Sequence, residues 1–165
     1  MYGVKFFVGT YAHNVDPKNR LFVPAKFRDG LTGTFNISVF RSKDYPCIQC
    51  FNEDLFAPYV QQMIDREPDV NLKRRVSVWY LGFAADVTVD SQGRINIPQN
   101  LLEKAKIEKE ALVVGMGDHV EIWNPDLFAS YNEIVDDWTA RNEEASEAAS
   151  DVALERKANG EGPTA

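Results

Sequence analysis

Two arginines each follow an aspartate by four residues, in two matching stretches of the 165-residue sequence. Residues 16–24 read DPKNRLFVP and residues 90–98 read DSQGRINIP, so the pattern Asp-x-x-x-Arg-apolar-x-apolar-Pro occurs twice, 74 positions apart. A guanidinium group is well shaped to bind phosphate or the O6 and N7 atoms of guanine, and a neighbouring carboxylate can steady it. These stretches are therefore the first candidates for a binding site.

The first stretch is more basic than the second. Lys18 lies within it, where the second stretch has Gln92, and further basic residues follow it on a predicted helix. The residues predicted to contact the phosphate or guanine of a nucleic acid are Lys18, Arg20, Lys26, Arg28 and Arg94. Asp16 and Asp90 are predicted to be structural, because an aspartate that begins a turn commonly accepts backbone N–H bonds. We expect the first stretch to dominate DNA binding.

Other reactive side chains give weaker signals. Cys47 and Cys50 have the C-x-x-C spacing of zinc or redox sites, but the sequence holds no second pair of cysteines. We predict that both are half-buried in a strand, where residues three apart point to opposite faces. His13 and His119 lie in strand-like segments without a nucleophile motif nearby, and a Gly-rich phosphate loop is absent. We therefore expect no enzyme activity, no metal, no cofactor and no small-molecule substrate.

The charge is distributed unevenly along the chain. The formal net charge is −7, and nine acidic and three basic residues lie from Glu133 onward. Residues 1–30 carry five basic and two acidic residues. A local basic patch, not the charge of the whole chain, decides whether a phosphate backbone can bind. The acidic composition is therefore compatible with nucleic-acid binding by the N-terminal part.

A second matching pair extends the repeat. Residues 51–59 read FNEDLFAPY and residues 123–131 read WNPDLFASY, an offset of 72. Two matched pairs in the same order indicate duplication of a structural unit. We predict a first module at 1–60, a helical connector at 61–82, a second module at 83–132 and a tail at 133–165. The tail is expected to be an acidic helix that soon becomes disordered.

Each module is expected to contain the same elements. An alternating strand leads into a tight hairpin, in which Asn19 and Gly93 are the residues expected to have positive φ. A short strand and a proline-started helix follow, and Gly30 is expected to cap the first helix. Two more strands lead to a closing helix, which Asn52 or Asn124 is expected to cap.

With both hairpins, the basic LKRRVSVWYLGFA segment at 72–84 and the WNP at 123–125, the sequence resembles the MraZ family over residues 1–140. That family belongs to the AbrB/SpoVT swapped-hairpin transcription factors. The resemblance implies an α+β fold with two tandem swapped-hairpin AbrB-like β modules interlocked in one subunit, plus connector and C-terminal helices. It implies a ring-shaped homo-oligomer. Two features depart from the family pattern: Asn19 stands where glycine is usual, and the acidic tail after Glu143 is not part of the motif and has no assigned role.

The resemblance also implies a function. The expected activity is transcriptional regulation through binding of double-stranded DNA, at direct repeats upstream of the division and cell-wall gene cluster. Among the motif residues, Arg20, Lys18 and Arg94 would meet the DNA. The sequence lacks an apolar run that could cross a bilayer or serve as a secretion signal, so a cytoplasmic, nucleoid-associated protein is expected.

A protein-binding or antitoxin-type AbrB-like module is the alternative. The basic residues at 73–75 bear on it, since they suit a solvated helix face or an intersubunit contact better than a base contact. Salt separates the two functions, because binding to DNA weakens steeply with salt and an apolar protein contact does not.

Overall fold

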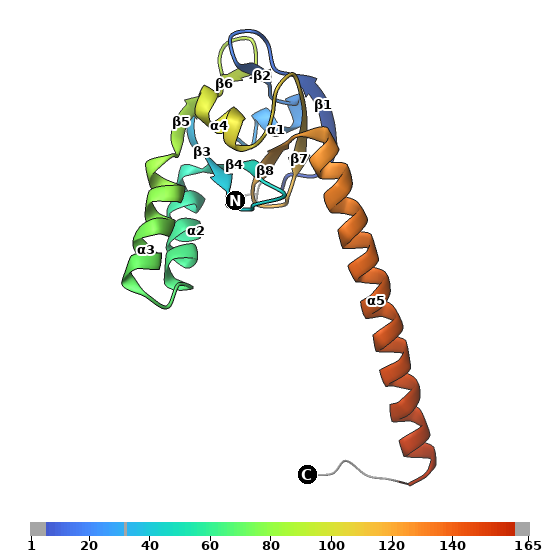
Figure 1. Cartoon of the computed structure of the whole chain (residues 1–165). Helices are drawn as coiled ribbons and strands as arrows, with labels where there is room; N and C mark the ends of the chain where they lie inside the picture. The colour runs from blue at the N-terminus through green and yellow to red at the C-terminus, as the bar shows by residue number, and fades with distance from the viewer. Residues whose placement is uncertain (1–5, 32, 161–165) are drawn as a thin grey trace, which may run out of the picture. The chain divides into compact units, whose positions relative to one another are not determined.

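The chain folds into antiparallel sheets and helices, which confirms the expected α+β class (Figure 1). The computed structural model describes residues 6–31 and 33–160. The first five residues of the predicted first module and the last five of the predicted tail thus lie outside the described residues. Of the helices described, none is long and apolar enough to span a membrane.

The main sheet has six strands in the order β1-β7-β8-β4-β3-β5, and every neighbouring pair is antiparallel. Its strands are β1 Thr10–Asn14, β3 Thr34–Phe40, β4 Cys47–Asn52, β5 Ala85–Thr88, β7 Glu110–Gly115 and β8 Val120–Trp123. The first strand of each repeat hydrogen-bonds to the other repeat, because β1 pairs with β7 and β5 pairs with β3. Neither repeat therefore completes its own part of this sheet.

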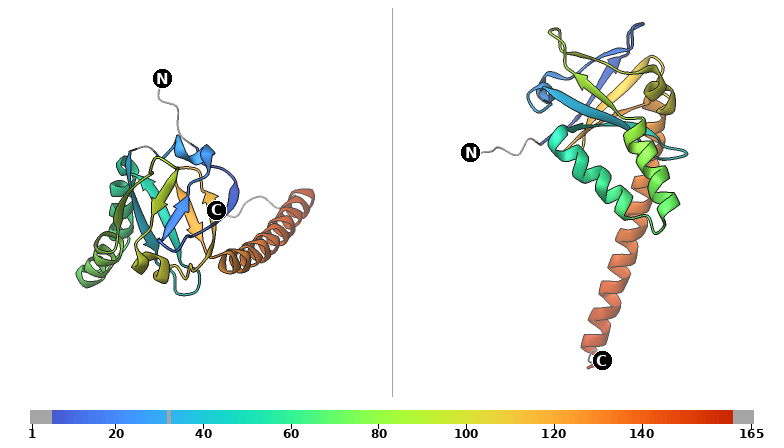
Figure 2. Two further views of the ribbon diagram at one scale, coloured as in Figure 1. Left: turned by 90° about the horizontal axis from the view of Figure 1, so that it is seen from above. Right: turned by 90° about the vertical axis from the view of Figure 1, so that its left-hand side faces the viewer.

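A second sheet is a ribbon of two short strands, β2 Arg20–Phe22 and β6 Arg94–Asn96. Each repeat supplies one strand, and Leu21 lies directly opposite Ile95, its counterpart 74 positions later. Both side chains are almost completely buried, at 1% and 2% exposure. The β2–β6 ribbon is thus anchored to the core by its middle residues. Figure 2 shows its two turns projecting from one end of the body.

The main core lies between the six-stranded sheet, the ribbon and two short helices, α1 Ala25–Arg28 and α4 Gln99–Lys104. Phe27 from α1 and Leu101 from α4 are buried there beside Ile37 and Ile122 of the sheet. Burying an aliphatic or aromatic side chain of this size contributes about 1.5–3 kcal/mol. The same core therefore fixes both the sheet and the base of the ribbon.

The predicted connector forms a helical hairpin of α2 Glu53–Asp65 and α3 Val70–Ser77, followed by a π-helical turn, η1 Val78–Gly82. Asp69 caps α3, because its side chain accepts a 2.9 Å hydrogen bond from the Leu72 N–H. A second apolar cluster packs the hairpin on the sheet, through Phe51, Phe56, Val60, Val76 and Tyr80. The amphipathic stripes expected in this segment are thus its buried faces.

The last helix, α5, extends from Pro125 to Ala158 and continues further than the sequence led us to expect. Residues 1–128 form one compact unit and residues 129–165 a second. Alanine and glutamate are strong helix formers, and they are frequent between Glu143 and Ala158. An ion pair at helical spacing, Asp137 with Arg141 at 3.6 Å, lies in the same helix.

Two local expectations were wrong. Asn52 does not cap α2 with its side chain; its amide instead donates to the Gly30 carbonyl oxygen at 2.8 Å. Gly30 is not a left-handed cap, and glycine is favoured there because a Cβ would clash with the ring of the buried Phe7. Asn124, by contrast, caps α5 as expected, accepting a 2.8 Å hydrogen bond from the Asp126 N–H.

Candidate nucleic-acid interface

The first hairpin is built around the carboxylate of Asp16. Oδ1 accepts hydrogen bonds from the backbone N–H groups of Lys18 and Arg20, each at 2.9 Å. Oδ2 accepts one from Arg20 Nε at 2.7 Å, which is also an ion pair. The aspartate therefore closes the turn and orients the guanidinium with the same side chain. Among the described residues, the side-chain hydrogen bond of Arg20 to Asp16 uses Nε alone, which leaves the Nη groups for another partner.

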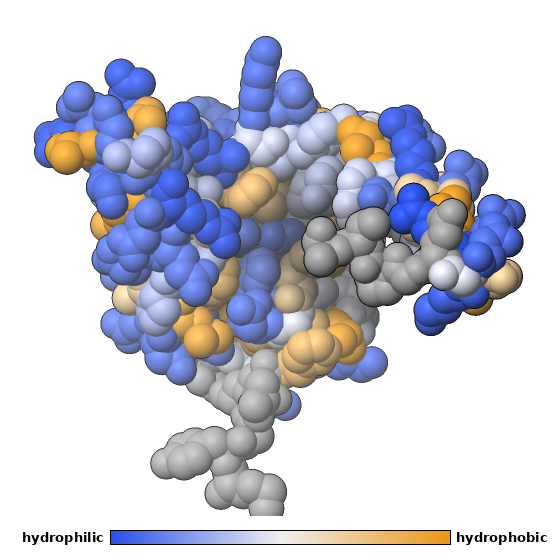
Figure 3. All heavy atoms as spheres, turned by 90° about the horizontal axis from the view of Figure 1, so that it is seen from below, coloured by the Kyte–Doolittle hydropathy of each residue, from blue (hydrophilic) through white to orange (hydrophobic). Residues whose placement is uncertain are grey.

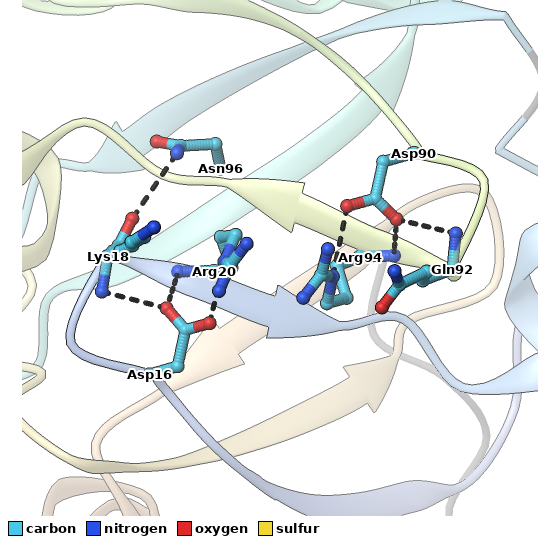
Figure 4. A network of polar contacts seen from close by, with 7 residues as sticks. All are labelled: Asp16, Lys18, Arg20, Asp90, Gln92, Arg94 and Asn96. Atoms are coloured by element: carbon cyan, nitrogen blue, oxygen red, sulfur yellow. Dashed lines mark hydrogen bonds and ion pairs between the residues drawn. The ribbon is translucent and has the colours of Figure 1, made fainter.

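The second hairpin repeats this arrangement atom for atom. Asp90 Oδ1 accepts from the N–H groups of Gln92 and Arg94 at 2.9 Å, and Oδ2 accepts from Arg94 Nε at 3.0 Å. Figure 4 shows the two hairpins side by side, with both arginines between the two aspartates. The two arginines predicted from the repeat are thus brought together on one ribbon.

Both carboxylates are held in the ionised form. The hydrogen bond from the Arg20 backbone N–H is the largest influence on Asp16. Together with the Arg20 guanidinium and the Lys18 N–H, it outweighs desolvation and holds the pKa of Asp16 below its ordinary value. The Arg94 N–H, the Gln92 N–H and the Arg94 guanidinium likewise lower the pKa of Asp90. Each arginine therefore keeps a charged partner at neutral pH.

The ribbon has one buried and one exposed face. Side chains alternate along a strand, and since Leu21 and Ile95 enter the core, their neighbours face outward. We call the outward residues Arg20, Phe22, Arg94 and Asn96 the ribbon face. Arg20 lies opposite Asn96, and Phe22 lies opposite Arg94. Directly opposite residues on one face are about 5 Å apart and diagonal ones about 7–8 Å, so the four side chains form one small surface.

The turns have the backbone geometry expected from the sequence. Asn19 has φ 61° and Gly93 has φ 82°. The Asn19 side chain donates from Nδ2 to Gln99 Oε1 at 2.9 Å. Asparagine is among the non-glycine residues that most readily adopt positive φ, so Asn19 can form the turn that Gly93 forms in the second repeat.

Arg28 lies at the second hairpin and not at the first. Its Nε donates to the Val23 carbonyl oxygen at 2.8 Å, and a Cβ on Gly93 would come within 2.5 Å of its Cζ. Lys26 is exposed on α1, and Lys18 lies in the first turn beside Asp16. Of the predicted basic residues, the structure thus brings Arg28 to the turn of the other repeat, a contact that sequence spacing does not reveal.

Two members of the ribbon face were missed in the sequence. Phe22 is 44% exposed, and Asn96 is exposed and donates from Nδ2 to the Lys18 carbonyl oxygen at 3.3 Å. The two-residue period of a strand places each of them on the same side as its arginine, and the pairing of β2 with β6 joins the two sides into one face.

The cysteines and histidines have structural neighbours. Cys47 and Cys50 are both buried in β4, the first beside Val114 and Trp123 and the second in the main core. Burial, with the nearby Glu121 carboxylate, raises the pKa of both thiols. His119 hydrogen-bonds to Asp118 and Glu121, while His13 lies in β1 near the Phe22 ring.

Comparison with known proteins identifies relatives along most of the chain. A family model described as "MraZ protein, putative antitoxin-like" matches residues 6–76 and 81–153. A protein of Limosilactobacillus fermentum named "Transcriptional regulator MraZ" is 38% identical over 77% of this chain and 87% of its own. A protein of Clostridium beijerinckii with the same name is 39% identical over the same shares of the two chains.

A third relative covers a larger share of the chain than the first two. The Mesoplasma florum protein, also named "Transcriptional regulator MraZ", is 35% identical over 86% of this chain and 93% of its own. That name denotes a class of regulators and not a class of enzymes. The family match falls into two segments that each contain one Asp-x-x-x-Arg hairpin, as the internal repeat requires. By these matches, the chain belongs to the MraZ family.

Proposed function

We propose that this chain is a sequence-specific DNA-binding regulator of transcription. The observation that carries the proposal is the ribbon face, on which two arginines, each fixed by an aspartate, lie together on a two-stranded antiparallel ribbon. The major groove of B-DNA admits a two-stranded ribbon, and arginine binds the O6 and N7 atoms of guanine there. The names of the relatives support the same class of function.

The fold we propose is a pair of tandem swapped-hairpin modules of AbrB type, interlocked within one subunit. Three pairings support it, because β1 with β7, β5 with β3 and β2 with β6 all join one repeat to the other. The proposed modules are residues 1–60 and 83–132, with the connector at 61–82 and the tail at 133–165. Each Asp-x-x-x-Arg hairpin then belongs to one module, and its strand pairs with a strand of the other module.

The proposed DNA contacts are Lys18, Arg20, Lys26, Arg28 and Arg94. The two arginines of the ribbon face would read base edges, and the surrounding basic residues would contact phosphates, which position a protein without specifying sequence. Asp16, Asn19, Asp90 and Gly93 would keep the turns in shape. The contact of Arg28 with the second turn extends this basic surface across both hairpins.

We further propose that copies assemble into a ring, which binds direct repeats upstream of the division and cell-wall gene cluster in the nucleoid. Exposed apolar side chains support self-association: Phe6, Val8 and Met116 are 72%, 57% and 47% exposed. Figure 3 shows exposed apolar side chains among the hydrophilic ones on the face of the molecule seen from below. Several ribbons engaging one DNA would multiply the affinity without improving any single contact.

Gel-shift titration of the full chain on the DNA upstream of its own gene, against scrambled DNA, tests the proposal. Arg20→Ala should remove specific binding while circular dichroism stays unchanged, since the side chain is 31% exposed and contributes little to the core. A lost guanine or phosphate contact costs about 1–3 kcal/mol at each site. Normal promoter binding by folded Arg20→Ala would refute the assignment.

The second candidate is a protein-binding module of antitoxin type, which the printed description of the matching family favours. The two candidates differ in their response to salt. The logarithm of DNA affinity falls linearly with the logarithm of salt concentration, with a slope set by the number of phosphates contacted. Binding to a protein through an apolar surface would instead change little between 50 and 200 mM salt.

A further inference from the structure

The ribbon face is nearly two-fold symmetric. Leu21 and Ile95 hold the same place in the two repeats and lie directly opposite each other. The two-fold axis that relates the repeats in the ribbon therefore passes between them. The same set of hydrogen bonds forms on either side of this axis, between Asp16 and Arg20 on one side and between Asp90 and Arg94 on the other. If every ribbon residue obeyed this symmetry, the face would read a palindromic element equally well in both directions.

Phe22 and Asn96 break the symmetry. They hold equivalent places in the two repeats, 74 positions apart, and both lie on the exposed face. Phe22 presents an apolar ring beside Arg94, whereas Asn96 presents an amide beside Arg20. One half of the face is therefore arginine with an aromatic ring, and the other half is arginine with a hydrogen-bonding amide.

These two side chains suit different base pairs. An asparagine amide can donate to N7 and accept from N6 of adenine, and an apolar side chain packs on the C5 methyl group of thymine. We propose that Phe22 and Asn96 give each subunit a direction on DNA, so that the element it reads is not palindromic. This inference rests on the proposed DNA-binding function and assigns specificity to two residues of the same site.

The contacts that Phe22 and Asn96 make within the protein leave both side chains able to contact a base. Phe22 is 44% exposed, and its described ring neighbour, His13, lies 6.5 Å away between ring centres. Asn96 uses one N–H on the Lys18 carbonyl oxygen at 3.3 Å, which leaves its other N–H and its oxygen for a base. That hydrogen bond also fixes the amide beside the first turn.

The turns contain a second asymmetry, Lys18 against Gln92, with a different expected effect. A lysine ammonium is a point charge that serves phosphates, and phosphate contacts carry no sequence information. Lys18 therefore explains a difference in affinity between the two halves, whereas Phe22 and Asn96 explain a difference in the bases read.

Selection from a duplex library with a random core tests the inference with the full-length protein. The wild type should select a non-palindromic element. Phe22→Asn and Asn96→Phe each make the ribbon face symmetric, and each should select an element much closer to a palindrome. Asn96→Ala should bind the wild-type element about tenfold more weakly and lose preference at one position.

Two controls separate this role from general effects. Phe40→Asn makes the same chemical change at a 37% exposed phenylalanine of β3, outside the ribbon, and should leave the selected element unchanged. Lys18→Gln should lower affinity on all sequences and keep the asymmetry. Thermal melting establishes that each variant is folded, and the two symmetric variants test the idea independently.

The outcomes distinguish this inference from the proposed function. A palindromic wild-type element, or an unchanged asymmetric element in both folded symmetric variants, overturns the inference while salt-dependent specific binding keeps the function. If the wild type selects no sequence at all, the proposed function fails, and the inference fails with it.

Discussion

Gln49 donates a hydrogen bond from Nε2 to Glu121 Oε2 at 3.1 Å, and the two residues hold equivalent places, 72 positions apart, in the two repeats. They lie opposite each other where β4 meets β8, at the centre of the main sheet. Both are buried, at 5% and 8% exposure. In the main sheet, the two repeats therefore meet at a polar pair of residues. In the ribbon they meet at an apolar pair, Leu21 and Ile95.

The neighbours of Glu121 complete its hydrogen bonding. Its other oxygen accepts from Trp123 Nε1 at 3.1 Å, and His119 Nε2 lies 3.1 Å from Oε2. His119 also pairs with Asp118 and stacks on the Phe51 ring, with ring centres 4.6 Å apart. A buried network of this kind is costly to leave partly satisfied, so its members should respond strongly to mutation and pH.

The first prediction concerns pH. Burial alone would lower the pKa of His119, but hydrogen bonds to the Glu121 and Asp118 carboxylates outweigh it and raise that pKa above 6.5. A raised pKa stabilises the fold fully below about pH 6.5, and this stabilisation is lost as pH rises through the folded-state value. Urea unfolding from pH 6 to pH 8, below the range in which the cysteines of the unfolded chain ionise, should therefore show a falling free energy of unfolding. His119→Gln should remove that slope, and an equal slope in this variant would contradict the prediction.

Glu121 has the opposite dependence. Burial raises its pKa, but hydrogen bonds from His119, Gln49 and Trp123 outweigh burial and lower it below 4.5. The stability that ionised Glu121 contributes to the fold is therefore fully present above about pH 4.5. It is lost as pH falls through the lower pKa that Glu121 has in the folded state. Glu121→Ala leaves buried donors without an acceptor, so we expect a loss of about 3–5 kcal/mol. Denaturant unfolding at pH 6 measures it, with the exposed Glu103→Ala as the control.

The second prediction compares the two arginines. Arg94→Ala should weaken DNA binding less than Arg20→Ala, because Arg20 has Lys18 in its turn and a more exposed side chain, 31% against 17%. Gel-shift titration of both variants on one duplex measures the difference. Equal losses, or the reverse order, would mean that Arg94 contributes as much or that Arg28 supplies the second turn with enough charge.

The third prediction separates positioning from simple electrostatics. Asp16→Asn removes a negative charge beside the proposed DNA contacts, which by charge alone would strengthen binding. It also removes the ion pair that orients Arg20. We expect positioning to dominate and specific affinity to fall about tenfold, since a misoriented guanidinium loses its bidentate contact. Tighter specific binding by Asp16→Asn would show that the carboxylate only repels DNA.

The fourth prediction concerns the acidic C-terminal segment. Deleting residues 143–165 removes six acidic and two basic residues. Residues 1–128 form a compact unit, so the truncated protein should stay folded. It should bind random duplex DNA more tightly at low salt, because the deleted charge competes with phosphates for the basic side chains.

Salt concentration provides the internal control for this deletion. The gain in affinity should shrink as the Debye length falls from about 30 Å at 0.01 M to about 8 Å at 0.15 M. An unchanged or weaker affinity at low salt would exclude competition and leave the segment as an inert or assembly-related extension.

Local structure was predictable wherever the determinant lies within a few residues. The strands, the turn residues Asn19 and Gly93 and the cap at Asn124 follow from side-chain period and turn chemistry, and the structure confirms them. Errors arose where a partner lies far along the chain. Asn52 hydrogen-bonds to the Gly30 carbonyl oxygen instead of capping its helix, and Gly30 lies against the Phe7 ring. Arg28 likewise lies against Gly93 of the other repeat.

The candidate site divides in the same way. The Asp–Arg pairs could be predicted because four-residue spacing across a turn brings both groups together. The ribbon face could not, because the sequence of one strand does not say which strand it will pair with. Only the pairing of β2 with β6 brings Phe22 beside Arg94 and Asn96 beside Arg20.

The pairing of β1 with β7 has a consequence for how the chain is made. A ribosome releases residues 10–14 long before residues 110–115, so the first strand must wait for nearly the whole protein before its partner exists. Until then, the first repeat exposes strand edges and apolar side chains that the second repeat will cover. A nascent chain stopped near residue 80 would find its best substitute in another copy of the same half, because the repeats are equivalent. Prematurely ended translation should thus yield paired fragments.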